Sequence, residues 1–384
     1  DYRNRIGRKQ FNRWFPSPYY DNEIRRSYKG GFAYVNPLYR GKDIEKGMVL
    51  DINSMYPYIL REKMLPYGEG KHFTGQYQPD PDYPLYTQRL RCIFDLKIGK
   101  IPTIQIKNKF SQFRPTEYLY SSKDDEVDMT LTSVDLEVFF DHYDVTVIEW
   151  VDGWKFKGGT EMFKEYVDYW MDVKIQGEKE NKPGVRTVAK QMLVGLYGKF
   201  GMNTFIKERI PYLDHFGVVQ YRVEDPQPKD PIYVPLATFV TAWGRKIIVE
   251  AIEHCGERFL YCDTDSIHLI GWEKPAGVWI DQYALGAFKI ERYFEKARYL
   301  RPKSYITVLQ GKLDITCSNL QKRAYNLYET YRKQPERLKL IPKRCQPKVT
   351  WDNFRYGTSY YGNLSPKKVN GGMVLEETIF TLSD

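Results

Sequence analysis

Short apolar runs separated by turn residues make up most of the first 157 positions of the chain. A β-like stretch covers residues 32–39, and the apolar run 48–50 stops at Asp51. That pattern is typical of a buried strand that ends on a carboxylate. Residues 66–157 alternate short β-like runs with turn signals, and the pattern at 133–142 predicts the helix among them. This part of the chain is therefore expected to be rich in strands.

Helical periodicity begins after Thr160, which can cap a first helix, and a second helix is predicted from Val185 to about Tyr197. Prolines within 202–235 block long helices there, and helical periodicity resumes at 237–253. Residues 259–270 predict two short strands around a tight turn. The whole pattern predicts a two-sided core of strands and helices with helical and β insertions.

Composition adds a preference for polyanionic partners. The chain has 384 residues, enough for two or three domains at a prior of about 150 residues each. It carries 58 basic against 49 acidic residues, together with 32 tyrosines, which suits phosphate neutralisation and stacking on bases. Many enzymes are mildly basic, so composition alone gives even odds for a nucleic acid partner. Five basic side chains in the first fifteen residues predict an exposed basic arm over residues 1–15.

Several classes of protein are excluded by what the sequence lacks. No run approaches the ~18 apolar residues that span a membrane, and no N-terminal signal pattern is present. Five cysteines without a C-x-x-C pair argue against a disulfide framework and against structural zinc. No G-x-x-x-x-G-K-[ST] phosphate loop occurs. A catalytic metal in this chain must therefore be held by carboxylates.

The predicted hairpin at 259–270 places two carboxylates close together. Asp263 and Asp265 lie at its tip between apolar flanks, and alternate residues of a strand share a face. Such a pair repels itself unless a cation lies between or beside the carboxylates. An EF-hand is excluded because the twelfth loop position would be Lys274. A plain aspartate-rich turn is the alternative, and the apolar flanks favour a cation site over it.

Asp51 supplies a third carboxylate from a distant segment. Strand-borne carboxylates from two segments can hold two Mg²⁺ ions ~3.5–4 Å apart. This arrangement serves in-line displacement at phosphorus, because one ion activates the attacking hydroxyl and the other stabilises the leaving oxygen. Asp51 is equally able to act as the N-cap of a helix at 54–60.

The second helix of the predicted pair carries a third candidate element. Arg186, Lys190 and Tyr197 share roughly one helical face. A lysine followed by a tyrosine seven residues later can hold a triphosphate and pack under a base. A solvated lysine on an amphipathic helix is the alternative, and it is the commoner case.

Together these segments resemble the motifs of family B DNA polymerases. Residues 51–57 (D-x-x-S-M-Y-P) resemble motif A, and residues 190–198, with their lysine and Tyr-Gly pair, resemble motif B. Residues 261–266 (Y-x-D-T-D-S) resemble motif C, and the order and spacing of the three segments also fit.

The similarity extends to the protein-primed polymerases of the small Bacillus podophages. Three further motifs match. Tyr28, Gly30 and Gly31 form a template-binding Y-x-G-G, and Thr241 and Arg245 belong to a T-x-x-G-R. Lys303 and Tyr305 form a K-x-Y, which lies near the primer terminus in the family. Residues 91–107 and 202–234 resemble parts of two terminal-protein-region insertions. The similarity is weakest between about 318 and 348.

The resemblance implies an α+β fold shaped as a right hand. Its parts would be a palm of antiparallel sheet and helices, a helical fingers hairpin, a small thumb and two insertions. The implied boundaries, after the basic arm at 1–15, are the palm at 16–65 and 235–317, the first insertion at 66–157, the fingers at 158–201, the second insertion at 202–234, and the thumb with the C-terminal tail at 318–384.

The resemblance also implies a role for each residue of the site. Asp51 and Asp265 would bind both Mg²⁺ ions, for which Mn²⁺ can substitute, with the backbone carbonyl of Ile52 as a further ligand and Asp263 as support. Four side chains would hold the incoming nucleotide: Lys174 and Lys190 on the triphosphate, Tyr197 on the nascent pair, and Tyr56 as a steric gate against a ribose 2′-hydroxyl.

The implied activity is DNA-directed DNA synthesis from dNTPs on template and primer DNA. It would be primed by a terminal protein or a DNA 3′-hydroxyl, with strand displacement around a hairpin within 202–234. We expect a monomer that acts in the cytoplasm of an infected bacterial host. A primase-like polymerase is one alternative, which a small residue in place of Tyr56 would favour. A catalytically silent DNA-binding replication scaffold is the other, which loss of a metal carboxylate would favour.

Two departures from the family pattern bear on function. Val194 and Gly195 replace the usual Asn-Ser pair of motif B, a loss of polar contacts expected to weaken nucleotide binding or alter fidelity. Relatives carry an N-terminal 3′–5′ exonuclease domain with a D-x-E motif, for which there is no room before Tyr28. We therefore expect that this chain does not proofread.

Overall fold

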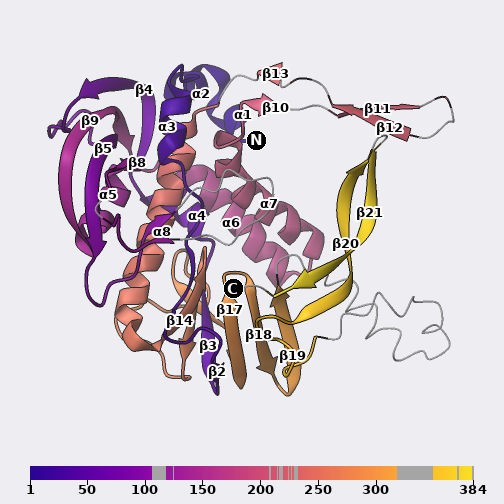
Figure 1. Cartoon of the computed structure of the whole chain (residues 1–384). Helices are drawn as coiled ribbons and strands as arrows, with labels where there is room; N and C mark the ends of the chain where they lie inside the picture. Colours follow the sequence, from indigo (N-terminus) through magenta and orange to yellow (C-terminus); the bar gives the residue numbers. More distant parts are fainter. Residues whose placement is uncertain are drawn as a thin grey trace.

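A five-stranded antiparallel sheet forms the centre of the computed structural model (Figure 1). The structure describes residues 1–105, 118–123, 125–206, 209–213, 215, 219–223, 225, 227–228, 232–317, 349–369 and 372–382. The strand order is β1-β14-β15-β3-β16, and the strands are β1 (Ala33–Val35), β3 (Gly47–Ile52), β14 (Phe259–Asp263), β15 (Ser266–Ile270) and β16 (Phe288–Phe294). Strand β3 lies between β15 and β16, so segments more than 200 positions apart in the sequence become neighbours.

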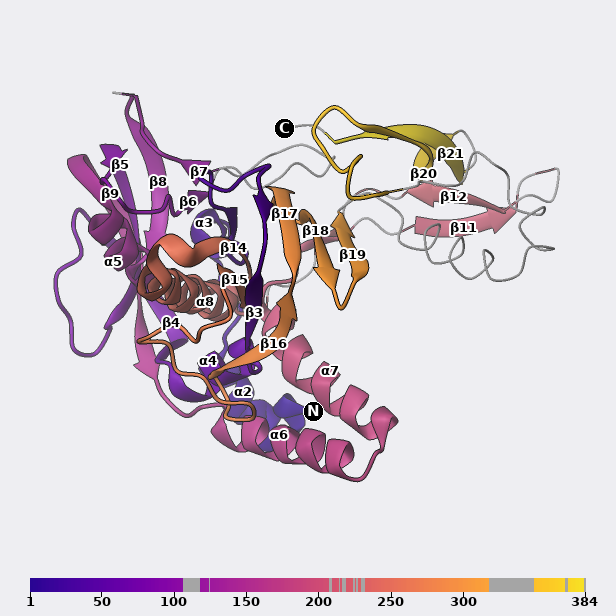
Figure 2. The ribbon, with the colours of Figure 1, turned by 90° about the horizontal axis from the view of Figure 1, so that it is seen from below.

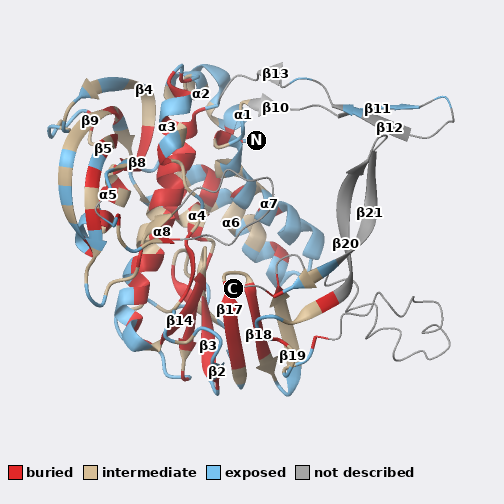
Figure 3. Ribbon diagram, viewed as in Figure 1, coloured by how far each residue is buried: buried red, intermediate tan, exposed pale blue. Residues whose placement is uncertain are grey.

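Helix α8 (Val234–Cys255) supports this sheet and is buried along most of its length (Figure 3). A helix that is apolar on nearly all sides must be covered on all sides. Here α8 contacts β14 and β15 of the sheet and also four helices. These helices are α3 (Asp21–Ser27), α4 (Met55–Glu62), α5 (Ser133–His142) and α7 (Pro183–Phe200). A short 3₁₀ turn (Gly256–Arg258) then leads into β14.

A second antiparallel sheet packs beside the central one, with strand order β19-β18-β17-β2. Its strands are β2 (Asp43–Ile44), β17 (Lys296–Arg301), β18 (Ser304–Leu309) and β19 (Lys312–Cys317). The interface between the two sheets is a cluster of buried aromatic residues that includes Tyr261, Tyr299 and Tyr305. Packing of these large rings fixes the position of the turn between β17 and β18 relative to β14.

A third antiparallel sheet, with order β4-β9-β5-β8, is built from residues 65–159 and has its own core around Phe94, Phe139 and Tyr143. Helix α5 packs on this sheet and covers residues 133–142, as predicted. The strands are β4 (Leu65–Thr74), β5 (Leu85–Leu96), β8 (Val127–Thr132) and β9 (Tyr143–Gly159), with a small pair β6 (Ile104–Gln105) and β7 (Tyr118–Leu119) at one edge.

The predicted helical pair is present as α6 (Lys164–Lys179) and α7 (Pro183–Phe200), which pack against each other. The first helix starts later than predicted, because Phe163 rather than Thr160 occupies the N-cap position. The second helix is longer than predicted. Pro183 lies in its first turn, where a missing backbone N–H costs no helical hydrogen bond.

The prediction of an exposed arm at residues 1–15 was wrong. The segment forms two short helices, α1 (Tyr2–Ile6) and α2 (Arg8–Trp14). Tyr2 and Phe15 are buried, and the ring centroid of Tyr2 lies 4.6 Å from that of Phe163. The basic side chains remain exposed on the outside of these helices. Burial of the aromatic residues therefore outweighs the tendency of the charged ones to keep the segment in solvent.

Two hairpins extend from the body of the molecule and lie beside each other (Figure 2). The first contains the pairs β10 (Phe205–Ile206) with β13 (Gln227–Pro228) and β11 (Arg209–Leu213) with β12 (Val219–Val223), and the second consists of β20 (Ser359–Val369) and β21 (Gly372–Thr381). Strand β12 contacts β21. The hairpin expected within 202–234 is thus present, although parts of this segment, like residues 318–348, lie outside the described residues.

Among the described residues, Cys92, Cys255, Cys262 and Cys317 are buried and form no disulfide with one another. Nor does any described helix have the length and apolar character that a membrane crossing requires.

Gly47 in β3 provides a test of the central sheet. A Cβ at this position would lie 2.1 Å from the Leu269 carbonyl oxygen and 2.2 Å from the ring of Phe294. We expect Gly47→Ala to destabilise the protein by about 3 kcal/mol or more, because the Leu269 carbonyl belongs to the paired strand β15 and the ring of Phe294 is buried. Gly195→Ala is the control, since a Cβ there meets no atom within 4 Å. It should stabilise α7 by up to about 1 kcal/mol. Urea unfolding of both variants measures these effects, and equal stability would contradict the register of β3.

Candidate active site

Strand pairing brings the three predicted carboxylates to one end of the central sheet. Asp51 pairs with Ser266 on β15, and Asp263 on β14 pairs with the same serine across the hairpin. The Ile52 N–H donates a hydrogen bond to the Asp265 carbonyl at 2.8 Å. Asp265 therefore lies in a turn held directly against the end of β3. The prediction that these segments meet is confirmed.

Asp51 does not act as a helix N-cap, which was its alternative interpretation. It belongs to β3, and the N-cap of α4 is Ser54, whose φ of 53° is left-handed. The backbone therefore turns sharply between the strand and the helix. This turn leaves the Asp51 carboxylate beside the hairpin and places Tyr56 on the first turn of α4.

The negative charges of the three carboxylates repel one another. Burial and the negative charge of Asp51 raise the pKa of Asp265 to about 6, and Asp263 adds to the effect. Lysines are bound to the other two carboxylates: Lys289 Nζ lies 2.9 Å from Asp51 Oδ1, and Lys303 Nζ lies 2.9 Å from both oxygens of Asp263. The site therefore attracts positive charge.

These residues fit divalent ions of the Mg²⁺ type. Such ions prefer oxygen ligands, and carboxylates are the usual protein donors. Asp51 and Asp265 are close enough to shift a pKa, and a cation between them would remove that repulsion. Ile52, the last residue of β3, follows Asp51 directly and brings a backbone carbonyl to the same strand end.

A second cluster of acidic residues is neutralised by a lysine of the protein. Within the described part of the chain, Asp141, His142 and Glu253 are the one set of three whose ligand atoms all lie within 4.8 Å of one another. The ammonium of Lys100 binds both carboxylates, at 2.6 Å from Asp141 Oδ2. This cluster is therefore already neutralised by a side chain of the protein.

Positive side chains from the helical pair lie opposite the carboxylates. Lys174 on α6 donates a hydrogen bond to Ser54 Oγ at 3.0 Å. Its pKa is lowered by burial and then by the charges of Lys289, Arg186 and Lys190. Four cations therefore converge on one region. Lys190 on α7 is exposed, so its ammonium is accessible to a ligand.

Two tyrosines pack together near Asp265. The ring centroids of Tyr56 and Tyr197 are 4.2 Å apart with an interplanar angle of 36°. Burial, the neighbouring Tyr197 and the charge of Asp265 raise the pKa of Tyr56 well above its usual value. Both rings thus border Asp265, where predicted roles at the sugar and the base require them.

The Y-x-G-G segment packs directly on the carboxylate hairpin. A Cβ on Gly31 would lie 2.7 Å from Thr264 Oγ1, so only glycine allows this close approach. The Thr264 N–H donates to the Phe32 carbonyl at 2.7 Å. Gly30 is exposed, with nothing within 4 Å of a Cβ. Tyr28 is half-buried, and its hydroxyl lies against Gly201 at the end of α7.

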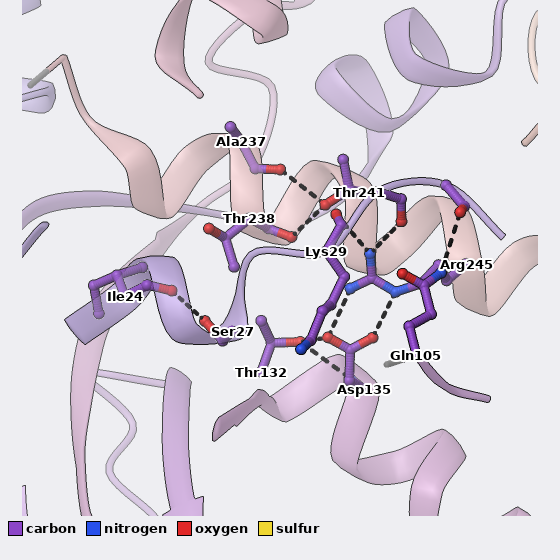
Figure 4. Close-up of polar contacts among 12 residues, drawn as sticks. Ile24, Ser27, Lys29, Gln105, Thr132, Asp135, Ala237, Thr238, Thr241 and Arg245 are labelled. Atoms are coloured by element: carbon purple, nitrogen blue, oxygen red, sulfur yellow. Dashed lines mark hydrogen bonds and ion pairs between the residues drawn. The ribbon is translucent and has the colours of Figure 1, made fainter. Parts of the chain in front are cut away.

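Thr241 and Arg245 lie on buried α8 and act within the protein (Figure 4). The Thr241 hydroxyl donates to carbonyls of its own helix. Arg245 donates to the carbonyls of Lys29 and Gly30 at 3.0 and 2.8 Å and pairs with Asp135 through two nitrogens. The T-x-x-G-R segment thus anchors the Y-x-G-G segment to helix α5, which packs on the third sheet.

Lys303 and Tyr305 hold the second sheet against the hairpin. Lys303 has a left-handed φ of 60°, and its N–H donates to the Tyr261 hydroxyl at 3.1 Å. That hydroxyl in turn donates to Asp263 at 3.2 Å. Tyr305 is only 7% exposed and packs on Tyr261 and His268. A direct contact of its ring with DNA would require a rearrangement of this cluster.

Sequence patterns missed two functional candidates, Lys289 and Asp135. Lys289 lies in β16 outside every motif, and only the pairing with β3 places it opposite Asp51. Asp135 carries a local signal, because Thr132 Oγ1 accepts a hydrogen bond from its N–H as an N-cap. That signal predicts the start of a helix but says nothing of a distant arginine. Val194 is 47% exposed and Gly195 is open, so the departure in motif B faces solvent rather than the core.

The raised pKa of Asp265 predicts a pH-dependent penalty in the metal-free protein. A rise from 3.8 to about 6 corresponds to roughly 1–3 kcal/mol that opposes folding once the carboxyl is ionised. Well below pH 3.8 the carboxyl is protonated in both the folded and unfolded states, so the penalty is absent, and at pH 4 only a small part of it remains. In EDTA, Asp265→Asn should be more stable than the wild type at pH 7.5 and about equally stable at pH 4. Urea unfolding at both values measures this, and an equal difference at the two pH values would contradict it.

The family model for organellar and viral type B DNA polymerases matches residues 2–277. The DNA polymerase of Bacillus phage B103 is 41% identical over 98% of this chain, and that of Streptococcus phage Cp-1 is 30% identical over 99%. The chain spans 65% and 64% of the length of these relatives. The solved structure of phi29 DNA polymerase with primer-template DNA and incoming nucleotides covers the whole chain with a TM-score of 0.85 at 36% identity, over 66% of its own length. The chain therefore belongs to the type B DNA polymerases of organelles and viruses.

Proposed function

We propose that this chain carries the nucleotidyl-transfer site of a DNA-directed DNA polymerase. The observation that carries the proposal is that Asp51 and Asp265 lie near a group of cations and near two tyrosine rings that pack together. A dNTP needs these three environments: oxygen ligands for its metal ions, cations for its triphosphate and flat surfaces for its sugar and base. Relatives named as DNA polymerases support the assignment.

Asp51 and Asp265 would hold two Mg²⁺ ions, or Mn²⁺ in their place, together with the Ile52 carbonyl. When bound, such ions lower the pKa of an attacking hydroxyl and stabilise the leaving phosphate oxygen. Asp263 acts as support, because Lys303 and Tyr261 already bind its carboxylate. Its contribution is to keep the hairpin tip, and hence Asp265, in place.

Lys174 and Lys190 bind and orient the triphosphate in this proposal. The nearby charges that lower the pKa of Lys174 include Lys289, Arg186 and Lys190, and a bound polyanion would relieve their repulsion. Exposure of Lys190 allows it to contact a phosphate as the nucleotide enters. Tyr197 then packs on the nascent pair, and Tyr56 occupies the space that a ribose 2′-hydroxyl requires.

Template and primer contacts follow from the backbone segments around the hairpin. Exposed Gly30 allows a DNA strand to approach the main chain, and Tyr28 lies beside it. Thr241, Arg245 and Tyr305 would act on DNA by positioning, since all three are buried. Lys303 is the member of the K-x-Y segment with an accessible side chain, 45% exposed.

The right-hand division suggests how the parts cooperate. The central sheet with α8 would be the palm, α6 and α7 the fingers, the third sheet the first insertion, and the two extended hairpins parts of the second insertion and the thumb. A hairpin at 202–234 that meets β21 would enclose the template and support strand displacement. We propose further that a terminal protein primes synthesis and that the chain acts as a monomer in the cytoplasm of an infected bacterial cell; the relatives from Bacillus and Streptococcus phages support the bacterial host.

Replacement of a metal-binding carboxylate tests the chemistry. We expect Asp51→Ala to abolish nucleotide addition while DNA affinity changes little, because DNA phosphates are bound by dispersed basic residues. Primer extension and fluorescence anisotropy with labelled DNA measure the two properties. Asp141→Ala is the control, because this exposed aspartate belongs to the cluster that Lys100 neutralises. Substantial extension by Asp51→Ala would overturn the proposal.

Replacement of Tyr56 tests the sugar gate. Tyr56→Val removes the ring that packs on Tyr197, so discrimination against ribonucleotides should fall about 10- to 100-fold while use of dNTPs changes little. Competitive incorporation of rNTPs and dNTPs gives this ratio. Tyr58→Val, two residues along the same helix and packed against Gly286, is the matched control. Unchanged discrimination in Tyr56→Val would assign the ring to packing alone.

A further inference from the structure

Lys289 contacts the carboxylate of Asp51, and no sequence motif includes this lysine. It lies on β16 directly opposite Asp51 on β3. Residues opposite each other on paired strands project to the same face of a sheet. Its Nζ lies 2.9 Å from Asp51 Oδ1, with the two side chains 32% and 24% exposed.

The same ammonium also acts on both halves of the site. Its charge lowers the pKa of Asp265, in opposition to the neighbouring aspartates. It is also the largest charge effect on Lys174, whose pKa it lowers. Lys289 therefore contacts Asp51 and is also close enough to Lys174, which binds Ser54 in the turn after β3, for the two ammonium groups to repel each other.

We propose that Lys289 is a positioning residue that occupies Asp51 in the absence of metal and contacts the nucleotide triphosphate once a divalent ion has taken that carboxylate. The inference rests on the proposed function, because it assumes that Asp51 is a metal ligand. Two cations cannot share Asp51 Oδ1 without strong repulsion, so ion binding and the Lys289 pair compete.

This competition couples the two ligands. Without nucleotide, Lys289 weakens binding of a divalent ion to Asp51. With nucleotide, the displaced ammonium finds a new partner in the triphosphate, which offsets the loss of the ion pair. The site therefore favours joint binding of ion and nucleotide over binding of the ion alone.

Mn²⁺ binding to the full chain without nucleotide tests the competition, with free Mn²⁺ measured by electron paramagnetic resonance. We expect Lys289→Met to bind Mn²⁺ roughly three- to tenfold more tightly than the wild type, as removal of one adjacent positive charge implies. Lys289→Arg keeps the charge and should resemble the wild type. Lys296→Met is the matched control, because Lys296 is also a strand lysine paired with an aspartate, Asp43, at 3.4 Å. It should leave Mn²⁺ affinity unchanged.

Nucleotide binding supplies the second readout. In the presence of Mn²⁺, Lys289→Met should weaken dNTP binding to the protein–DNA complex several-fold, and Lys289→Arg should largely preserve it. Circular dichroism establishes that each variant is folded. Should Lys289→Met misfold, tighter Mn²⁺ binding by Lys289→Gln would support the inference. Equal Mn²⁺ affinity in the wild type and a folded neutral variant would overturn it.

Asp51→Asn separates failure of this inference from failure of the proposed function. If Asp51→Asn loses Mn²⁺ binding while neutral replacement of Lys289 has no effect, the metal site stands and the competition is refuted. If Asp51→Asn binds Mn²⁺ as the wild type does, Asp51 is not a ligand, and both the proposed function and this inference are overturned.

Discussion

The pairing of β3 with the β14–β15 hairpin forces two like charges together, and the rest of the structure is arranged around that constraint. Burial and the negative charge of Asp51 raise the free-energy cost of ionising Asp265, whose pKa is about 6. The strands themselves are buried on both faces, so burial of their apolar residues holds the carboxylates in place against the repulsion. A site built in this way requires cations, and the protein supplies Lys289 from β16 and Lys303 from the turn between β17 and β18.

Much of this arrangement could be predicted from the sequence, because its elements carry local signals. The apolar run before Asp51 predicted β3, the flanks of Asp263 and Asp265 predicted the hairpin, and amphipathic spacing predicted α7. Each of these patterns reflects burial of a face within one element. The three carboxylates could then be joined because apolar strands that end in acidic residues have few ways to pack.

Features that depend on which strand or helix packs against another could not be predicted from the sequence. In the sequence Lys289 cannot be told from any other strand lysine until the register between β16 and β3 is known. A shift of that register by one residue would turn its side chain to the other face of the sheet. The pairing of Asp135 with Arg245 joins positions 110 residues apart through side chains buried at the contact of α5 with α8. The N-terminal helices were missed for a similar reason, because Tyr2 becomes apolar core only once Phe163 covers it.

The short motifs are best understood as one connected unit rather than as separate ligand sites. Arg245 holds the carbonyls of Lys29 and Gly30, and the next residue, Gly31, packs on Thr264 at the tip of the carboxylate hairpin. The Phe32 carbonyl then accepts the Thr264 N–H, which fixes the turn that contains Asp265. Gly31 packs so closely on Thr264 that a Cβ there would lie 2.7 Å from Thr264 Oγ1. Movement of one of these segments therefore displaces the next by direct contact. Arg245 can therefore influence the geometry of Asp265 without contacting a substrate. Glycine and arginine have complementary roles here, because Gly31 allows the close approach to Thr264 and Arg245 holds the preceding carbonyls of Lys29 and Gly30.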